Sequence, residues 1–326
     1  MTNEITLENY RSYPALNYST LAKVDRNPFL LLRDDSEQSQ ALTLGSIVDC
    51  LMTNQSKFND LYIVADAQKP TGQQGEFIDK LWNLWRVDTV LEDIFDLAYE
   101  DVKTGNGGKL RDGLDKFISN FEEKGGRTYF EFLISTVGKT VITQEEYNSC
   151  NRIVSAFLTN DFTKEYFTPK KNVEILYQYP LVFELEGTLY KVLLDMIIID
   201  HIQKTIQPID IKTMSEAISS FPYSVFKWRY DIQASLYNTA VRKNYSDFYE
   251  ILPFKFIVGS FSNYKVAVFN AEALLDFGMF GGETTWGTEY KGWLELTKLY
   301  KWHIETQQFE YTKELYDSNG EVMLKI

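Results

Sequence analysis

The stretch from residue 173 to residue 212 limits the fold of this chain more than any other. Aromatic and β-branched residues alternate over 174–183, as they do in strands, and Glu186-Gly187 has the composition of a hairpin turn. Residues 190–200 form an apolar run that predicts a buried strand, and 205–212 is predicted to pair with it. The sequence therefore predicts an α/β protein with a sheet in this region.

Helical patterns account for most of the remaining chain. Apolar residues three and four apart predict a mainly helical part over 1–165. In 166–326, an α/β core, we expect further elements: a long helix over 220–242, strands over 251–260 and 265–270, a short helix over 271–280 and a long C-terminal helix. The whole chain, 1–326, is expected to form a single domain.

Composition narrows the class of protein. The N-terminus has neither a basic region nor an apolar stretch, so no signal peptide is expected, and no apolar run reaches the ~18–20 residues that span a bilayer. Cys50 and Cys150 are the only cysteines, too few for a four-cysteine zinc or iron–sulfur site. We expect a cytoplasmic protein with two buried free thiols and no membrane partner.

The net charge of −13 argues against bulk electrostatic attraction to nucleic acid. It leaves room for a local basic groove. Residues 214–270 carry six Lys or Arg against four Asp or Glu, a local charge of +2, whereas the other large segments are net negative. This positive segment directly follows Lys212.

Two carboxylates and a lysine stand out on the predicted sheet. Asp210 and Lys212 are two apart on a strand, so both side chains point to one face, and Asp195 lies on the preceding strand. Paired carboxylates repel unless a cation joins them, and oxygen ligands suit Mg²⁺ or Mn²⁺. The pattern predicts a metal site for phosphodiester hydrolysis. The alternative is an Asp–Lys ion pair at a strand end, which Glu174 and Lys191, expected near the same place, make less favourable.

The predicted helix after these strands carries a polar face. Tyr230, Gln233 and Tyr237 are spaced for one side of a helix, where they would bind a phosphate or hold the lysine; simple packing is the alternative. Lys227 and Arg229, one turn earlier, are expected to meet the DNA backbone.

Asp49 is a lone charge within the apolar helical segment 43–52. A carboxylate among apolar side chains is costly unless it is paired or binds a ligand. A solvated helix edge and a ligand site are both compatible with the periodicity.

Several short motifs follow one another over residues 15–240: Tyr18-Ser-Thr-Leu with Asn27-Pro28, Leu44-Gly-Ser-Ile-Val-Asp49, Glu174, Lys191 with Asp195, Asp210-Ile-Lys-Thr213, and Tyr230-x-x-Gln233-x-x-x-Tyr237. In this order and spacing they resemble the PD-(D/E)xK nuclease superfamily. Within it, they are most similar to the RecE-type (exodeoxyribonuclease VIII-like) phage exonucleases and their RecB-like relatives.

The resemblance implies a restriction-endonuclease-like core, a mixed sheet flanked by helices, that hydrolyses DNA with Mg²⁺ or Mn²⁺. It implies metal ligation and catalysis by Asp49, Asp195, Asp210, Ile211, Lys212, Gln233 and Tyr237. It implies supporting or DNA-binding roles for Glu174, Lys191, Thr213, Lys227, Arg229 and Tyr230. It also implies a homo-oligomeric ring, a single-strand annealing protein as partner, and a role in phage recombination or DNA processing in the host cytoplasm.

One position departs from the family pattern. Asp49 stands where the family usually has a metal-binding histidine. Aspartate also binds Mg²⁺ or Mn²⁺, so activity is retained in principle while the metal preference changes. The leading hypothesis is an exonuclease. The alternatives are an inactive nuclease fold that binds DNA or plays a structural part, and an endonuclease of the same superfamily.

Overall fold

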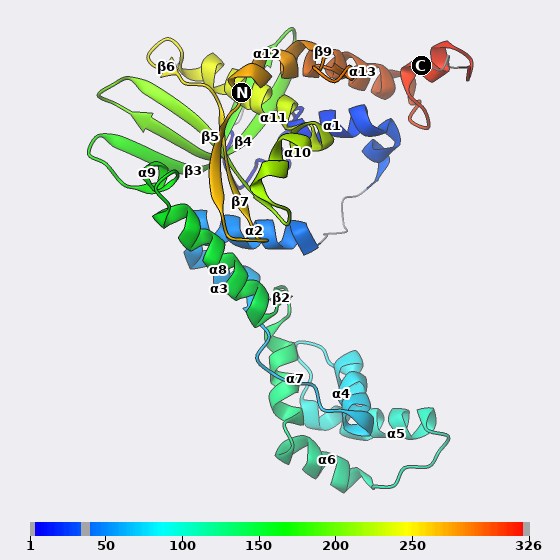
Figure 1. Cartoon of the computed structure of the whole chain (residues 1–326). Coiled ribbons are helices and arrows are strands. Elements are labelled where there is room, and N and C mark those ends of the chain that lie inside the picture. The colour runs from blue at the N-terminus through cyan, green and yellow to red at the C-terminus, as the bar shows by residue number, and fades with distance from the viewer. Residues whose placement is uncertain (1–3, 34–39, 322–326) are drawn as a thin grey trace. The chain divides into compact units, whose positions relative to one another are not determined.

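The computed structural model describes residues 4–33 and 40–321, which divide into two compact units (Figure 1). One unit comprises Met1–Gln55 and Ser149–Ile326, and the other comprises Ser56–Asn148. The sequence predicts a division of the chain near residue 165, where helical patterns give way to strands. The two units are instead defined by which residues pack together, so they do not share that boundary. The first unit carries the predicted site.

A six-stranded mixed sheet forms the centre of the first unit, as the sequence predicts for an α/β protein. Its order is β3-β4-β5-β7-β8, with β6 paired to β5. Adjacent strands are antiparallel except that β7 and β6 run parallel to β5. The strands are β3 (Val173–Leu185), β4 (Thr188–Asp200), β5 (Thr205–Met214), β6 (Glu250–Ile251), β7 (Lys255–Ser260) and β8 (Val266–Asn270).

Of two local predictions for the sheet, one is confirmed and the other is wrong. The hairpin is confirmed: Glu186 and Gly187 join β3 to β4 with φ of 49° and 67°, the left-handed pair that a tight two-residue turn requires. The single strand expected over 251–260 is wrong, because it is split into β6 and β7. Pro253 lies between them and has no N–H to donate to a ladder.

Helices cover the sheet and its ends. They are α1 (Tyr18–Arg26), α2 (Gln40–Thr53), α8 (Gln144–Thr159), α9 (Lys164–Phe167), α10 (Phe221–Trp228), α11 (Tyr230–Tyr245), α12 (Glu272–Phe280), α13 (Trp293–Thr306) and α14 (Lys313–Asp317). Three 3₁₀ turns, η1 (Pro28–Leu32), η2 (Gln55–Lys57) and η4 (Ile218–Ser220), and a small hairpin of β9 (Gly281–Glu283) and β10 (Glu289–Lys291) complete the elements. The long C-terminal helix expected from the sequence is α13, which follows this hairpin.

The long helix expected over 220–242 is broken at Arg229. That residue adopts a left-handed conformation with φ of 60°, which ends α10 and begins α11. A non-glycine residue held there costs of order ~1 kcal/mol or more. Buried ion pairs of Arg229 with Asp25 and Asp231 hold the conformation, and no glycine or proline signals the break in the sequence.

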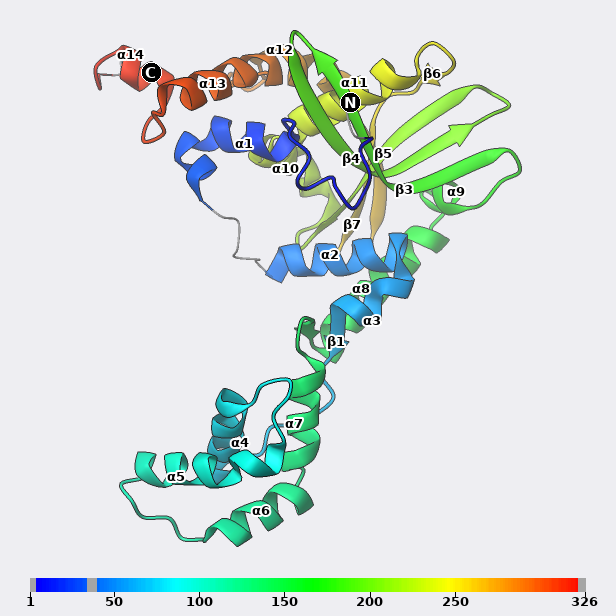
Figure 2. The ribbon, with the colours of Figure 1, turned by 180° about the vertical axis from the view of Figure 1, so that it is seen from behind.

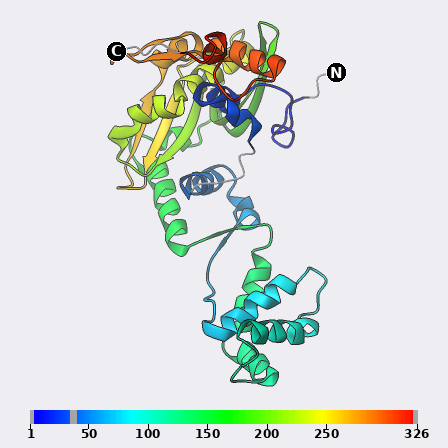
Figure 3. The same cartoon turned by 90° about the vertical axis from the view of Figure 1, so that its right-hand side faces the viewer.

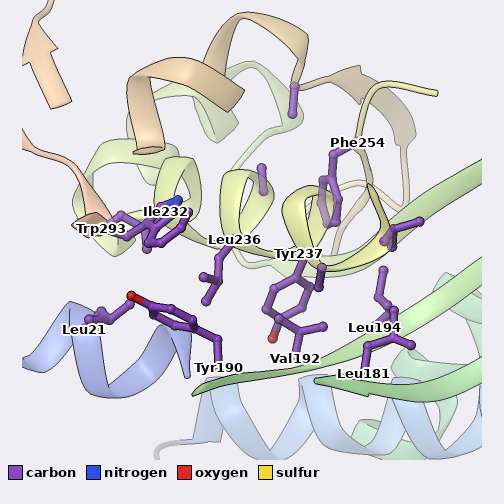
Figure 4. Close-up of a cluster of buried hydrophobic side chains, with 14 of the residues drawn as sticks. Leu21, Leu181, Tyr190, Val192, Leu194, Ile232, Leu236, Tyr237, Phe254 and Trp293 are labelled. Atoms are coloured by element: carbon purple, nitrogen blue, oxygen red, sulfur yellow. The ribbon is translucent and has the colours of Figure 1, made fainter. Parts of the chain in front are cut away.

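The main hydrophobic core lies between the sheet and α11 (Figure 4). Tyr190, Val192 and Leu194 of β4 face Leu236 and Tyr237 of α11 there. Figure 2 and Figure 3 show α1, α11, α12 and α13 gathered together, apart from α2.

The helices α2 and α8 approach the sheet elsewhere, α8 at a position that only glycine fits. A Cβ on Gly259 of β7 would lie 2.7 Å from the Phe157 ring of α8, so only glycine fits. A Cβ on Gly45 of α2 would lie 3.5 Å from the Thr213 hydroxyl of β5. This second approach brings α2, and with it Asp49, against the end of β5.

The second unit has its own aromatic core. Phe77, Phe95, Phe117, Phe121 and Phe130 are buried in it, and Trp82 and Trp85 stack on one another with ring centroids 5.4 Å apart. The elements are α3 (Phe58–Leu61), β1 (Tyr62–Val64), α4 (Gly72–Leu84), η3 (Leu91–Ile94), α5 (Phe95–Gly105), α6 (Leu114–Glu123), α7 (Gly126–Ser135) and β2 (Thr140–Ile142). Within the ranges described, no helix of either unit is both long and apolar enough to span a membrane.

Candidate active site

A cavity of about 280 Å³ opens where α2, β4, β5 and the start of α11 meet. Its lining includes side chains from four separate parts of the sequence. They are Leu42, Gly45, Ser46, Val48, Asp49, Asp195, Ile211, Lys212, Thr213 and Tyr230. Six of the residues singled out from the sequence therefore line one cavity.

Asp195 is turned toward the cavity by an irregularity in the sheet. The pairing of β3 with β4 passes from Tyr177↔Met196 to Tyr179↔Leu194 and skips Gln178 and Asp195. Gln178 has a φ of 49°, which interrupts the extended strand. Oδ2 of Asp195 then accepts a hydrogen bond of 2.9 Å from the Ile211 backbone N–H on β5.

Beyond Ile209 the backbone of β5 is no longer paired with β4 and faces the site. The β4–β5 ladder runs only as far as Met196↔Ile209. The N–H and C=O of one strand residue point to the same edge, so the Ile211 carbonyl lies on the edge that its N–H shares with Asp195.

Asp210 lies beneath the cavity, with its side chain 1% exposed. Its Oδ1 accepts a 2.6 Å hydrogen bond from Nε2 of Gln233, and its Oδ2 lies 2.7 Å from Nζ of Lys212. The Lys212 ammonium also lies 4.8 Å from the centroid of the Tyr230 ring. Burial opposes the charge on Lys212, but Asp210 and the other anionic neighbours outweigh it, so the pKa of Lys212 lies above its ordinary value.

Asp49 is half-buried at the cavity wall, so the solvated helix edge is wrong. Nε2 of Gln178 donates a 2.8 Å hydrogen bond to its Oδ1. Burial, with a smaller contribution from Asp210, raises the pKa of Asp49 from 3.8 to about 6, although the Gln178 hydrogen bond and Lys212 act in the opposite direction. Burial and then Asp210 also hold the pKa of Asp195 well above its ordinary range. Carboxylates with such raised pKa values lack a sufficient positive partner.

The residues facing the cavity fit a hard divalent cation. Asp49 and Asp195 offer carboxylates and Ile211 offers a carbonyl on the same edge, while Mg²⁺ is commonly held by one or two carboxylates with water completing its shell. Over the described ranges, no group of three or more Asp, Glu, His or Cys side chains lies at metal-binding spacing. Gln233 and Lys212 contact the two oxygens of Asp210, which lies outside the lining of the cavity.

The polar face expected on α11 does point at the sheet. Tyr230 lines the cavity, Gln233 binds Asp210, and Tyr237 is buried with its ring centroid 6.2 Å from that of Phe254. Burial is the main cause that raises the pKa of Tyr237 well above its ordinary value. The face therefore both packs and holds site residues.

Glu174 and Lys191 do not join the site, which corrects the expected cluster of charges. Oε1 of Glu174 lies 3.1 Å from Nε2 of His201 at the far end of β4. Lys191 donates to three backbone carbonyls of the N-terminal segment, at 2.8 to 3.1 Å, and burial lowers its pKa. Each residue advances ~3.3 Å along a strand, so Lys191 and Ile199, the partner of Glu174, each lie ~13 Å from Asp195 along β4.

Arg229 is not placed to contact a DNA backbone, since it is buried against Asp25 and Asp231. Lys227 is exposed, as a DNA contact requires, and its ammonium lies 5.1 Å from the centroid of the Trp228 ring. Thr213 lines the cavity beside Gly45 of α2.

Gln178 is the site residue that the sequence prediction missed. A polar side chain among the aromatic residues of Tyr177-Gln-Tyr179 was its only signal. Its importance depends on the left-handed backbone and on Asp49, which lies 129 positions away in the sequence.

The functional interpretation of the site rests on its geometry and not on comparisons with known proteins. No protein-family model and no curated protein matches the chain. A solved structure from Eubacterium rectale, provisionally named an exonuclease, is similar over 99% of this chain and 96% of that chain, with 14% identity and a TM-score of 0.47. The structure of SSO0001 is similar over 59% of this chain and 71% of that chain, with 11% identity and a TM-score of 0.26.

Proposed function

We propose that this protein is a Mg²⁺- or Mn²⁺-dependent DNA exonuclease with a PD-(D/E)xK-type active site. The observation that carries the proposal is the cavity in which Asp49, Asp195 and Lys212 converge above the buried Asp210. Two carboxylates with raised pKa values beside a buried lysine favour a site that receives a cation and an anion together. A phosphodiester with its metal ion has that charge pattern.

Each residue has a distinct part in the proposed site. Asp49, Asp195 and the Ile211 carbonyl would hold the ion, which supplies positive charge beside a phosphate and acidifies a water. Lys212 places a fixed positive charge where negative charge develops on the phosphate. Asp210 orients Lys212, and Gln233 orients Asp210. For Asp210 to bind the ion as well, Lys212 would have to leave its Oδ2.

The sequence motifs extend the proposal beyond the site itself. They support a role in phage recombination or DNA processing in the cytoplasm, within a homo-oligomer and with a single-strand annealing protein as partner. Light scattering of the purified protein tests the oligomer, and a monomer at micromolar concentration would remove the ring from the proposal.

Digestion of end-labelled linear DNA and closed circular DNA tests the activity. With Mg²⁺ or Mn²⁺, linear DNA should be degraded from its ends and closed circles should persist. Cleavage of the circles would make the protein an endonuclease, and no cleavage of either substrate would make it an inactive nuclease fold.

Variants test the assignment of the site. Asp210→Ala and Lys212→Ala should each lower single-turnover cleavage by about 10²–10³-fold, the usual loss for removing a group that stabilises transition-state charge. Asp247→Ala and Lys243→Ala, which remove exposed charges of the same unit, are matched controls. Near-wild-type cleavage by either site variant would remove the assignment.

A further inference from the structure

Two cationic side chains lie over the exposed indole of Trp228, at the end of α10. The Trp228 side chain is 41% exposed, the Arg26 guanidinium carbon lies 5.2 Å from its ring centroid, and Nζ of Lys227 lies 5.1 Å from it. Neither Arg26 nor Lys227 forms an ion pair with any residue in the described ranges. Two like charges repel, so their convergence on one open ring favours an anion arriving there.

The position of this indole is fixed by its neighbours. The Tyr18 hydroxyl of α1 donates to the Trp228 carbonyl at 2.5 Å. The next residue, Arg229, is held in its left-handed conformation by Asp25 and Asp231. The indole therefore extends from a backbone that a hydrogen bond and ion pairs hold in place, and Arg26 of α1 and Lys227 of α10 are both exposed.

Trp228 also lies next to the active-site cavity. Tyr230, two residues further along the chain, lines that cavity. Two residues span at most about 7 Å between their Cα atoms, so the backbone that carries the indole lies within about one nucleotide step of the backbone of Tyr230. A strand with its phosphate in the cavity would bring a neighbouring base to Trp228.

We propose that Trp228, Arg26 and Lys227 form a platform for single-stranded DNA next to the cleavage site. A base stacks on the open part of the indole, and the two cations meet the flanking phosphates. The partner is a single strand rather than a duplex because a base must leave its own stack to offer its face to the indole. The platform rests on the proposed function, since the cavity supplies the reason for a strand to lie here.

Other exposed aromatic rings lack this combination. Trp286 is more exposed, at 60%, and packs edge-on against Phe226 with ring centroids 5.1 Å apart. Among the described residues no cation lies over the Trp286 ring. Trp286 is therefore a matched control for an exposed indole without cations.

Binding of fluorescein-labelled oligo(dT) in EDTA, where no cleavage takes place, tests the platform. Trp228→Ala should weaken binding by about 5- to 150-fold, the range for loss of one stacked base, and Trp228→Phe should lose less. Arg26→Ala with Lys227→Ala should reduce the salt dependence of binding. Trp286→Ala should stay within about twofold of the wild type.

Three results would overturn the platform: unchanged binding by Trp228→Ala, an equal loss in Trp286→Ala, or competition by blunt duplex as strong as by single strands. Tryptophan quenching by oligo(dT), present in the wild type and reduced in Trp228→Phe, should accompany binding. Its persistence at full amplitude in Trp228→Phe would also contradict stacking on this ring.

A small substrate separates this inference from the proposed function. Cleavage of the p-nitrophenyl ester of thymidine 5′-phosphate by the wild type, which requires no neighbouring nucleotide, tests the nuclease apart from the platform. If Trp228 governs binding but the wild type cleaves no DNA, the platform stands and the nuclease falls. If DNA is cleaved but Trp228→Ala binds normally, the nuclease stands and the platform falls.

Discussion

Replacing Asp49 with asparagine should stabilise the protein in the absence of metal while weakening its affinity for Mg²⁺. Asparagine keeps the shape of the side chain and an oxygen that accepts the hydrogen bond from Gln178, but it removes the negative charge. In the wild type that charge is buried near Asp210 and Asp195 without a sufficient cation. Its removal relieves both the burial and the repulsion.

The pKa of Asp49 sets the magnitude and the pH dependence. A rise from 3.8 to about 6 on folding corresponds to about 3 kcal/mol, at ~1.4 kcal/mol per pH unit. Because the folded state binds its proton more tightly, the wild-type free energy of unfolding falls as the pH rises from about 4 to 6. The stabilisation by Asp49→Asn should therefore be near zero below pH 4 and approach ~3 kcal/mol above pH 6.

The difference in unfolding free energy between Asp49→Asn and the wild type is measured by urea unfolding in EDTA at pH 4 and pH 8. Hydrogen exchange in peptides of β4 and β5 monitors the unfolding of the unit that contains α2. Asp247→Asn, which removes an exposed carboxylate, is the control and should not change the pH profile. Added Mg²⁺ should stabilise the wild type more than Asp49→Asn. Equal unfolding free energies of the wild type and Asp49→Asn at pH 8 would refute the inference that the Asp49 carboxylate is buried and repelled by its neighbours.

Three further predictions follow from the same contacts. Gln178→Ala removes a hydrogen bond that lowers the pKa of Asp49, so Mg²⁺ binding, measured by calorimetry, should need a higher pH than in the wild type; an unchanged pH midpoint would contradict it. Asp49→His should raise cleavage with Mn²⁺ relative to Mg²⁺, because imidazole favours softer ions, and identical metal titrations for both proteins would make Asp49 a bystander. Arg229→Ala leaves Asp25 and Asp231 without their buried partner and should cost about 3–5 kcal/mol in thermal or urea unfolding, whereas a loss below ~1 kcal/mol would show that the pairs are solvated.

Part of the candidate site was predictable from neighbouring residues. Asp210 and Lys212 had to share a face, because side chains two apart on a strand do. Their 2.7 Å ion pair is the arrangement that the sequence offered as the alternative to a metal site. The helical spacing of Tyr230 and Gln233 likewise placed both toward the sheet. The hairpin at Glu186-Gly187 was signalled by its glycine, the residue that adopts positive φ without strain.

Other features depended on contacts between distant parts of the chain. Glu174 and Lys191 satisfied every local pattern yet pair with His201 and with N-terminal carbonyls. The break at Arg229 has no local signal, since it is held by Asp25 from α1.

The sequence by itself determined the strands over 173–212, their hairpin and the shared face of Asp210 and Lys212, because backbone periodicity is a property of adjacent residues. Only the tertiary structure decided that Asp49 meets Gln178 and Asp195. Gln178 reaches Asp49 from 129 positions away because α2 packs against β5 and because the β3 backbone turns out of its pleat. Burial at that junction raises the pKa of Asp49, and burial is a property of packing, which no local pattern contains.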